Sequence, residues 1–288
     1  MTLRSILVPV RGDGLGEGVL DHALALGRRF DAHLDVVHCR PNPEDLLPFG
    51  VFVPTALKQK ITASAGGLAN EEEQRVKALF EDYCQRHRLA VAPARPWPEG
   101  RVSVSWREET GKQAAIVGVL GRLADVVAVA QPDHSRNLGL NTLEAALMET
   151  GRPVLLCPPA PLAGPLGVHV AVAWNGSTEA ARALAAALPV LAAAEKVSLL
   201  SVATGAKETL APAAVMDYLS DHGIAAEAES RTARASEVGQ ALLLAAREAG
   251  ADLLLMGAYG QSRGRELIMG GVTQHVVDHA DLPVLLCH

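Results

Sequence analysis

The chain has 288 residues, of which 49% are hydrophobic and 20% are charged, a balance typical of globular domains with buried cores. This length is enough for about two such domains. The net charge of -6 and the pI near 5.9, with no cluster of lysine and arginine, argue against a nucleic-acid partner. No apolar run reaches the roughly 18 residues that a membrane-spanning helix needs, so we expect no membrane partner either.

The first residues of the chain and its cysteines indicate the cellular compartment in which the protein is expected. Residues 1–4 lead directly into an apolar segment at 5–8, without the features of a signal peptide. The four cysteines show neither metal-ligand spacing nor the pattern of a secreted disulfide framework; they are Cys39, Cys84, Cys157 and Cys287. We therefore expect a cytoplasmic protein without a bound metal cluster.

Strand-like and helix-like segments alternate along the chain. In the first half we expect strands at about 5–10, 33–39, 101–106, 125–130 and 153–157, and helices at about 16–31, 65–88, 111–122 and 138–150. In the second half we expect strands at about 168–174, 196–203, 224–229, 251–257 and 283–287, and helices at about 178–194, 210–222, 235–249 and 271–280. Such alternation predicts βαβ units, hence parallel sheets with helices on both faces.

The two halves repeat each other. Three segments of the first half have echoes in the second half in the same order: 6–12 with 170–176, 124–130 with 251–257, and 152–158 with 282–288. We therefore predict one domain at 1–158, a linker at 159–166 and a second domain at 167–288. Residues 40–64 form a proline-rich insertion without a counterpart in the second half, and it could serve either as a lid over the first site or as a packing arm.

The last forty residues contain the most informative motif. An apolar strand at 252–256 is followed by Gly257 and Gly260, then by Gly270 and Gly271 at the start of a helix. Glycines allow backbone N–H groups to approach a phosphate closely, and the helix adds unpaired donors and the positive end of its dipole. The segment therefore has the pattern of an anion-binding loop.

The spacing Gly257-x2-Gly260-x9-Gly270, between two apolar strands, resembles the ATP-binding signature of the universal stress protein family. The resemblance covers nearly the whole chain as a tandem pair. It implies two α/β domains, each an open, mainly parallel five-stranded sheet flanked by helices (adenine-nucleotide α-hydrolase-like, or Rossmann-like). The family pattern ends in Gly followed by Ser or Thr, where this chain has Gly271. A family aspartate after the first strand is replaced by Arg11 and by Asn175.

Carried over residue by residue, the resemblance implies one nucleotide pocket, in the second domain, at the carboxyl ends of parallel strands. Its candidate residues are Ala173, Asn175, Val202, Met256, Gly257, Gly260, Gly270, Gly271 and Val272. Thr273 could substitute for the missing hydroxyl. The first domain has Asp133 and Leu140 in the corresponding loop, where a carboxylate repels phosphate and a side chain blocks close approach. We expect that site to be degenerate.

Each of these candidate site residues also has a simpler structural interpretation. The glycines could serve turns with positive φ. Arg263 and Arg265 could be solvent-exposed rather than phosphate ligands, and Ser177 could cap the helix that follows Asn175. The spacing of His275 and His279, with His288, is compatible with a metal site, but no carboxylate or cysteine completes a ligand set. We expect no metal and no catalytic residues.

Three functional classes remain in view. Motifs of related enzymes, such as Gly-x4-Gly-Lys-Ser/Thr and Gly-x-Ser-x-Gly, are absent, so we expect no enzyme, although slow ATP hydrolysis is compatible with the sequence. The preferred hypothesis is a stress-response sensor that binds an adenine nucleotide and shows an altered loop surface to a protein partner. The alternative is an interaction module without nucleotide. The tandem pair would form an intramolecular pseudo-dimer, compatible with further homodimerisation, with Cys157 and Cys287 near the seam.

Overall fold

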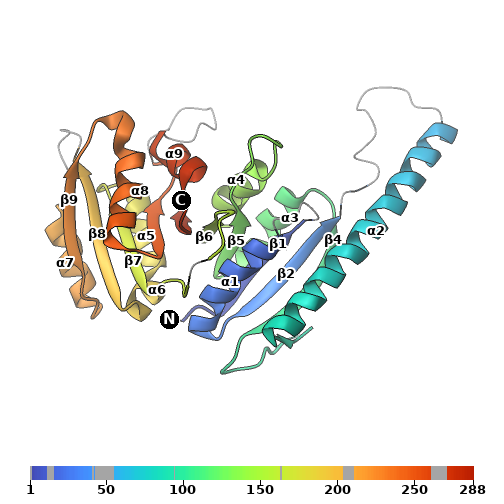
Figure 1. Ribbon diagram of the computed structural model, residues 1–288, viewed down its shortest axis with the longest axis horizontal. Helices are drawn as coiled ribbons and strands as arrows, with labels where there is room; N and C mark the ends of the chain where they lie inside the picture. Colours follow the sequence, from blue (N-terminus) through green and yellow to red (C-terminus); the bar gives the residue numbers. More distant parts are fainter. Residues whose placement is uncertain are drawn as a thin grey trace.

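The computed structural model describes residues 2–11, 16–40, 42, 55–93, 95–162, 164–203, 211–260 and 271–288, with the backbone alone for 55–70. The chain forms an α/β structure in which helices cover both faces of one long sheet (Figure 1). No helix in these ranges is both long and apolar enough to cross a membrane.

The first half contains six strands and four α-helices among the described residues. The strands are β1 (Ser5–Val10), β2 (His33–Arg40), β3 (Ala90–Val91), β4 (Ser103–Thr110), β5 (Val126–Ala130) and β6 (Val154–Cys157). The helices are α1 (Gly16–Phe30), α2 (Thr55–His87), α3 (Gln113–Leu120) and α4 (Leu140–Glu149), and the 3-10 turn η2 (Gly121–Leu123) follows α3.

The second half repeats this order with five strands. They are β7 (His169–Trp174), β8 (Lys196–Ala203), β9 (Glu227–Thr232), β10 (Leu253–Gly257) and β11 (Val284–Cys287). The helices are α5 (Thr178–Ala186), α6 (Leu188–Ala193), α7 (Pro212–Asp221), α8 (Val238–Ala249) and α9 (Gly271–His279), with the 3-10 turn η3 (Ala235–Glu237) before α8.

The strands of both halves belong to one sheet, in the order β3-β4-β2-β1-β5-β6-β11-β10-β7-β8-β9. Neighbours are parallel within each half, as the alternating pattern predicts, whereas β6 and β11 pair antiparallel. We call this β6–β11 pair the seam. The prediction of parallel α/β halves is confirmed, with β3 as an additional short strand and the two sheets joined at the seam.

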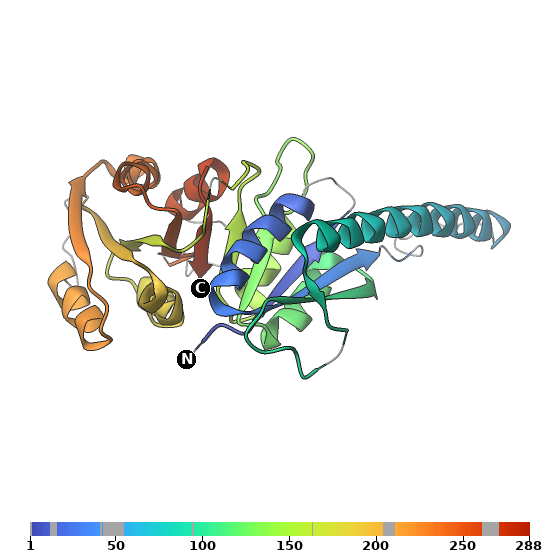
Figure 2. The same cartoon turned by 60° about the horizontal axis from the view of Figure 1, so that its bottom comes forward.

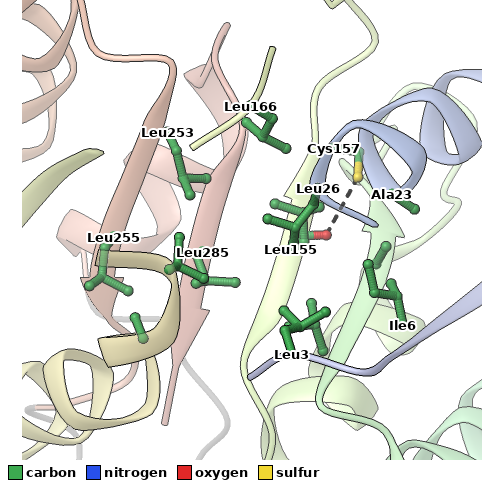
Figure 3. Close-up of a cluster of buried hydrophobic side chains, with 14 of the residues drawn as sticks. Leu3, Ile6, Ala23, Leu26, Leu155, Cys157, Leu166, Leu253, Leu255 and Leu285 are labelled. Atoms are coloured by element: carbon green, nitrogen blue, oxygen red, sulfur yellow. Dashed lines mark hydrogen bonds between the residues drawn. The ribbon is translucent and has the colours of Figure 1, made fainter. Parts of the chain in front are cut away.

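The apolar side chains of the strands form two buried layers. Helices α1, α2, α5, α6 and α7 contribute to one layer, and α3, α4, α8 and α9 contribute to the other. Figure 3 shows the first layer at the seam, where Leu155 and Leu285 are directly opposite in the antiparallel register. Cys157 and Cys287 end the two seam strands and are buried, and burial raises the pKa of the Cys287 thiol to about 12. Because the pairing is antiparallel, these cysteines lie at opposite ends of the seam.

Several element boundaries differ from those expected. Helix α2 begins at Thr55 rather than near residue 65, since no proline follows Pro54 until the helix has ended, and it extends well beyond the sheet (Figure 2). The single helix expected at 178–194 is two helices, because Pro189 cannot continue the hydrogen-bond pattern of α5. Strand β9 begins at Glu227, three residues late, because Ile224 is instead buried in the core before the strand.

Candidate functional site

The described candidate residues lie at the carboxyl ends of neighbouring strands in the second half. Ala173 and Asn175 end or follow β7, Val202 lies near the end of β8, and Gly257 ends β10. Strand β7 lies between β10 and β8, so these strand ends are adjacent. Met256 is buried beside Gly257, and Gly271 and Val272 begin α9. Gly270, Arg263 and Arg265 lie outside the described residues.

Gly257 is required by close packing. A methyl group at this position would lie 2.5 Å from the backbone nitrogen of Ala180 and 2.5 Å from the carbonyl carbon of Glu179. The end of β10 therefore contacts the backbone of the first turn of α5. Neither Gly257, Gly260 nor Gly271 has a positive φ. For these three glycines the interpretation as positive-φ turns is wrong, while Gly270 lies outside the described residues. The close approach that glycine permits is the physical reason at Gly257.

Among the described residues of this loop, the positive φ belongs to Tyr259, at +66°. Its backbone N–H points to the hydroxyl oxygen of Thr273 in α9, at 3.5 Å, and its side chain is buried. Burial is the largest cause that raises the Tyr259 pKa to about 12, and Glu144 in the first half adds to it. Thr273 is itself buried, and its hydroxyl oxygen faces the Tyr259 N–H, which favours a structural role over that of a substitute phosphate ligand.

Two polar residues that sequence reasoning missed border the glycine loop. A methyl group at Gly260 would lie 2.7 Å from Oε2 of Glu179. His288 reaches the same loop, with its Nδ1 3.1 Å from the carbonyl oxygen of Ala258. Glu179 could have been suspected, because it occupies the first turn of the helix after Asn175. The position of His288 depends on how β11 pairs with β10, which no local pattern reveals.

Glu179 is ionised at neutral pH. Burial by itself would raise its pKa, but its own backbone N–H, the Thr178 hydroxyl, and the charges of Arg182 and His288 lower it below the usual value. The carboxylate therefore adds negative charge beside Gly260. A phosphate placed there would experience repulsion unless a cation or a rotation of the side chain removed it.

The turn between β7 and α5 is built by two side chains. The Asn175 Oδ1 accepts a hydrogen bond from the Ser177 N–H at 3.1 Å, and the Ser177 hydroxyl accepts one from the Ala180 N–H at 3.1 Å. Gly176 between them has φ of +74°. The expected cap by Ser177 is confirmed. Asn175 remains exposed at the carboxyl end of β7, but its acceptor oxygen already serves the turn.

The described residues of the corresponding region in the first half leave a small cavity. A cavity of about 10 Å³ lies between Arg11, Gly16, Gln113 and Thr142, which is room for about one water molecule. The Arg11 guanidinium reaches the start of α4, where a methyl group at Gly139 would lie 3.4 Å from its Nη2.

Asp133 occupies a different position from the one expected. Its carboxylate accepts hydrogen bonds from the Ser135 N–H at 2.9 Å, the Ser135 hydroxyl at 2.6 Å and the Arg136 N–H at 3.2 Å. Residue 133 also bridges to Leu138 through the backbone. The carboxylate thus stabilises its own loop and does not point into the cavity, which corrects the expectation that it would repel phosphate there.

The histidines considered for a metal do not come together. The rings of His275 and His279 stack at 4.3 Å, whereas His288 contacts Ala258 and the Tyr259 ring. Within the described ranges, no group of three or more His, Cys, Asp or Glu side chains could hold a metal ion.

Comparison with known proteins gives one family and two informative structures. Residues 168–288 match the model of the universal stress protein family. A universal stress protein from Archaeoglobus fulgidus is 16% identical, with a TM-score of 0.67 over 99% of this chain and 96% of that chain. A functionally unknown protein from Pseudomonas aeruginosa is 14% identical, with a TM-score of 0.55 over 99% and 92%. At these identities the structures show a shared fold across both halves. No curated protein matches the chain significantly.

Proposed function

We propose that the chain is a member of the universal stress protein family, whose model matches residues 168–288, and that this second half binds an adenine nucleotide, ATP in the first place, as a regulatory ligand. Family membership supports a role in the stress response. The proposed role is that of a sensor rather than an enzyme, since the described site offers no nucleophile paired with a base.

The observation that carries the proposal is the placement of the glycine spacing. Gly257 ends β10 against the first turn of α5, and α9 begins at Gly271, where a methyl group would meet no atom of the described residues within 4 Å. Within that part of the structure, the start of α9 offers open space beside the first backbone N–H groups of the helix and the positive end of its dipole. These features support an anion at the carboxyl ends of β10 and β7, the usual ligand position of an open α/β sheet.

Isothermal titration with ATP tests the proposal. The wild type should bind in the micromolar range at one site per chain, and Gly260→Asp should abolish binding, because the new carboxylate would lie beside Glu179 and the phosphates. The ratio of absorbance at 260 and 280 nm of the purified protein provides an independent readout of bound nucleotide. A wild type that releases no heat and carries no nucleotide would overturn the proposal.

The second candidate function is an interaction module without nucleotide. Gly271 in place of a hydroxyl residue, Asn175 in place of an aspartate, and the ionised Glu179 beside Gly260 all favour it. In the sensor hypothesis, ATP changes the surface of residues 258–270 that a partner protein meets. Saturating ATP should then slow tryptic cleavage after Arg263 and Arg265, whereas an unchanged cleavage rate favours the ligand-free module.

A further inference from the structure

Helix α9 connects the glycine loop to the first half of the chain. It begins at Gly271, directly after the loop, and its other end, at His279, faces the first half (Figure 1). The helix has nine residues and is therefore about 13 Å long, short enough to move as one rigid body. The orientation of its first N–H groups, which would face the phosphates, thus depends on how the opposite end is held.

Two side chains of the first half hold that opposite end. The amide nitrogen Nε2 of Gln131 donates to the carbonyl oxygen of Val277 at 2.7 Å and to that of Ala280 at 3.3 Å. Nε2 of His134 lies 2.7 Å from Oδ1 of Asp278, in the same turn of the helix. Because the last carbonyl groups of a helix have no partner within it, these contacts fix the position of the helix end.

The first-half loop that carries both side chains is held by its own hydrogen bonds. Asp133 and Leu138 exchange two backbone hydrogen bonds, at 2.9 and 3.0 Å, and the Asp133 carboxylate accepts from the Ser135 N–H. The Gln131 N–H donates to the carbonyl oxygen of Cys157, at the end of β6, at 2.8 Å. The loop is therefore fixed to the first half and can position a neighbouring helix.

The two halves of the repeat differ at this point. The residue of the second half that corresponds to Gln131 is Ala258, whose methyl side chain has no donor. The end of α4, the counterpart of α9, is served by its own half, where the Thr150 hydroxyl donates to the carbonyl oxygen of Ala146. The first half thus supports the helix at the glycine loop through a side chain that the second half does not carry at the equivalent position.

We propose that the first half regulates the nucleotide site of the second half through α9, with Gln131 and His134 as positioning residues. This inference rests on the proposed function, and neither residue touches the ligand. Their contacts raise the fraction of molecules in which the start of α9 is placed to bind phosphate, and the apparent Kd falls in inverse proportion to that fraction. By linkage, bound ATP stabilises the same contacts and therefore the exposed loop at 131–138.

Calorimetric titration of the full chain with ATP tests the inference. Gln131→Ala should weaken ATP binding about five-fold, the lower end of the usual range of coupling between sites. Gln131→Glu keeps the shape of the side chain but removes its N–H donors, so it should weaken binding at least as much. His134→Ala should have a smaller effect, about two-fold, because its contact with Asp278 is partly exposed.

A second structural hydrogen bond provides the matched control. Tyr83→Phe removes the contact of the Tyr83 hydroxyl with Asp21, between α2 and α1 and away from α9. This variant should bind ATP like the wild type, even if its free energy of unfolding falls as much as that of Gln131→Ala. Amide hydrogen exchange gives a further readout, in which ATP should slow exchange at residues 133–138 in the wild type and less so in Gln131→Ala.

The outcomes separate this inference from the proposed function. A wild type that does not bind ATP overturns both. A wild type that binds ATP, with unchanged affinity in Gln131→Ala and Gln131→Glu, overturns the inference alone. The same holds if Tyr83→Phe weakens ATP binding as much as Gln131→Ala, or if bound ATP leaves the exchange of residues 133–138 unchanged.

Discussion

One aspartate in each half accepts hydrogen bonds from the segment that leads into the first strand of that half. This shared role explains one of the repeated sequence segments. Asp252, at the start of β10, accepts hydrogen bonds from the N–H groups of Gly167, Val168 and His169, and Asp125 does the same for Arg4 and Ser5 before β5. Each carboxylate fixes the segment that leads into the first strand of its half. The repeated Ala-Asp pair is therefore structural.

Replacing Asp252 by asparagine should destabilise the protein. The amide retains an acceptor but loses the charge that strengthens three N–H contacts, so we expect a loss of about 2 kcal/mol in the free energy of unfolding. Urea denaturation at pH 7 measures it. Asp217→Asn, at an exposed position of α7, is the control and should change the value by less than about 0.5 kcal/mol. Equal effects of the two substitutions would contradict the role assigned to Asp252.

A buried histidine makes stability depend on pH. The ring nitrogens of His33 contact the hydroxyl oxygens of Ser103 and Ser105, at 2.8 and 2.9 Å. The pKa of His33 is lowered to about 4, chiefly by burial, which Asp35 opposes and Arg95 reinforces. The folded state thus binds its proton less readily than the unfolded state does.

Acidification should therefore reduce stability through His33. The contribution is fully present above pH 6.5 and is lost as the pH falls toward about 4, by at most about 3 kcal/mol. Urea unfolding at pH 7, 5.5 and 4.5 should show a steeper decline for the wild type than for His33→Gln, in which this group is absent. Parallel declines in both proteins would refute the linkage.

Glu179 tests the electrostatics of the glycine loop. Since its carboxylate is ionised beside Gly260, Glu179→Gln should tighten ATP binding about five-fold by removing like-charge repulsion. Calorimetric titration measures the change, with Glu195→Gln at an exposed position as the control. Weaker ATP binding in Glu179→Gln would show instead that the carboxylate assists the ligand.

At the scale of elements, a side chain of the first half caps the carboxyl-terminal end of helix α9 in the second half. The Gln131 side-chain amide, in the loop after β5, donates to the carbonyl oxygens of Val277 and Ala280, at 2.7 and 3.3 Å. These carbonyls belong to the end of α9, where the helix itself supplies no partner. The first-half loop that corresponds to the glycine loop is thus part of the interface between the halves.

Replacing Gln131 by alanine should cost about 1–2 kcal/mol of unfolding free energy, because two carbonyl groups at the seam lose their donor. Thermal and urea unfolding measure the loss. Gln240→Ala, at an exposed position of α8, provides the comparison and should be nearly neutral. A neutral Gln131→Ala would mean that water replaces the amide without loss.

At the scale of the whole molecule, the seam makes the halves depend on each other. Residues 164–288 expressed alone would expose β11 as an unpaired strand with an apolar sequence. We expect this fragment to dimerise through β11, as measured by sedimentation, and Leu285→Lys within it to prevent the dimer. A fragment that stays monomeric at 100 μM concentrations or above (roughly the range where such edges associate) would contradict this.

The sequence by itself determined the α/β class, the two repeated halves, the Ser177 cap and the position of the glycine loop. These features follow from local periodicity and from short-range backbone chemistry, which each segment carries with it. The predicted element boundaries were wrong in two places. Ile224 is buried in the core before β9 rather than within the strand, and Pro189 divides a predicted helix whose apolar pattern is continuous.

Only the tertiary structure decided how distant segments meet. In the tertiary structure the halves pair through β6 and β11, and Glu179 and His288 lie beside the glycine loop. The Asp133 carboxylate accepts hydrogen bonds from its own loop. Such contacts depend on the close packing of side chains that are far apart in the sequence. A hydrophobic pattern predicts which face of an element is buried, but it does not predict which distant residues pack against that face.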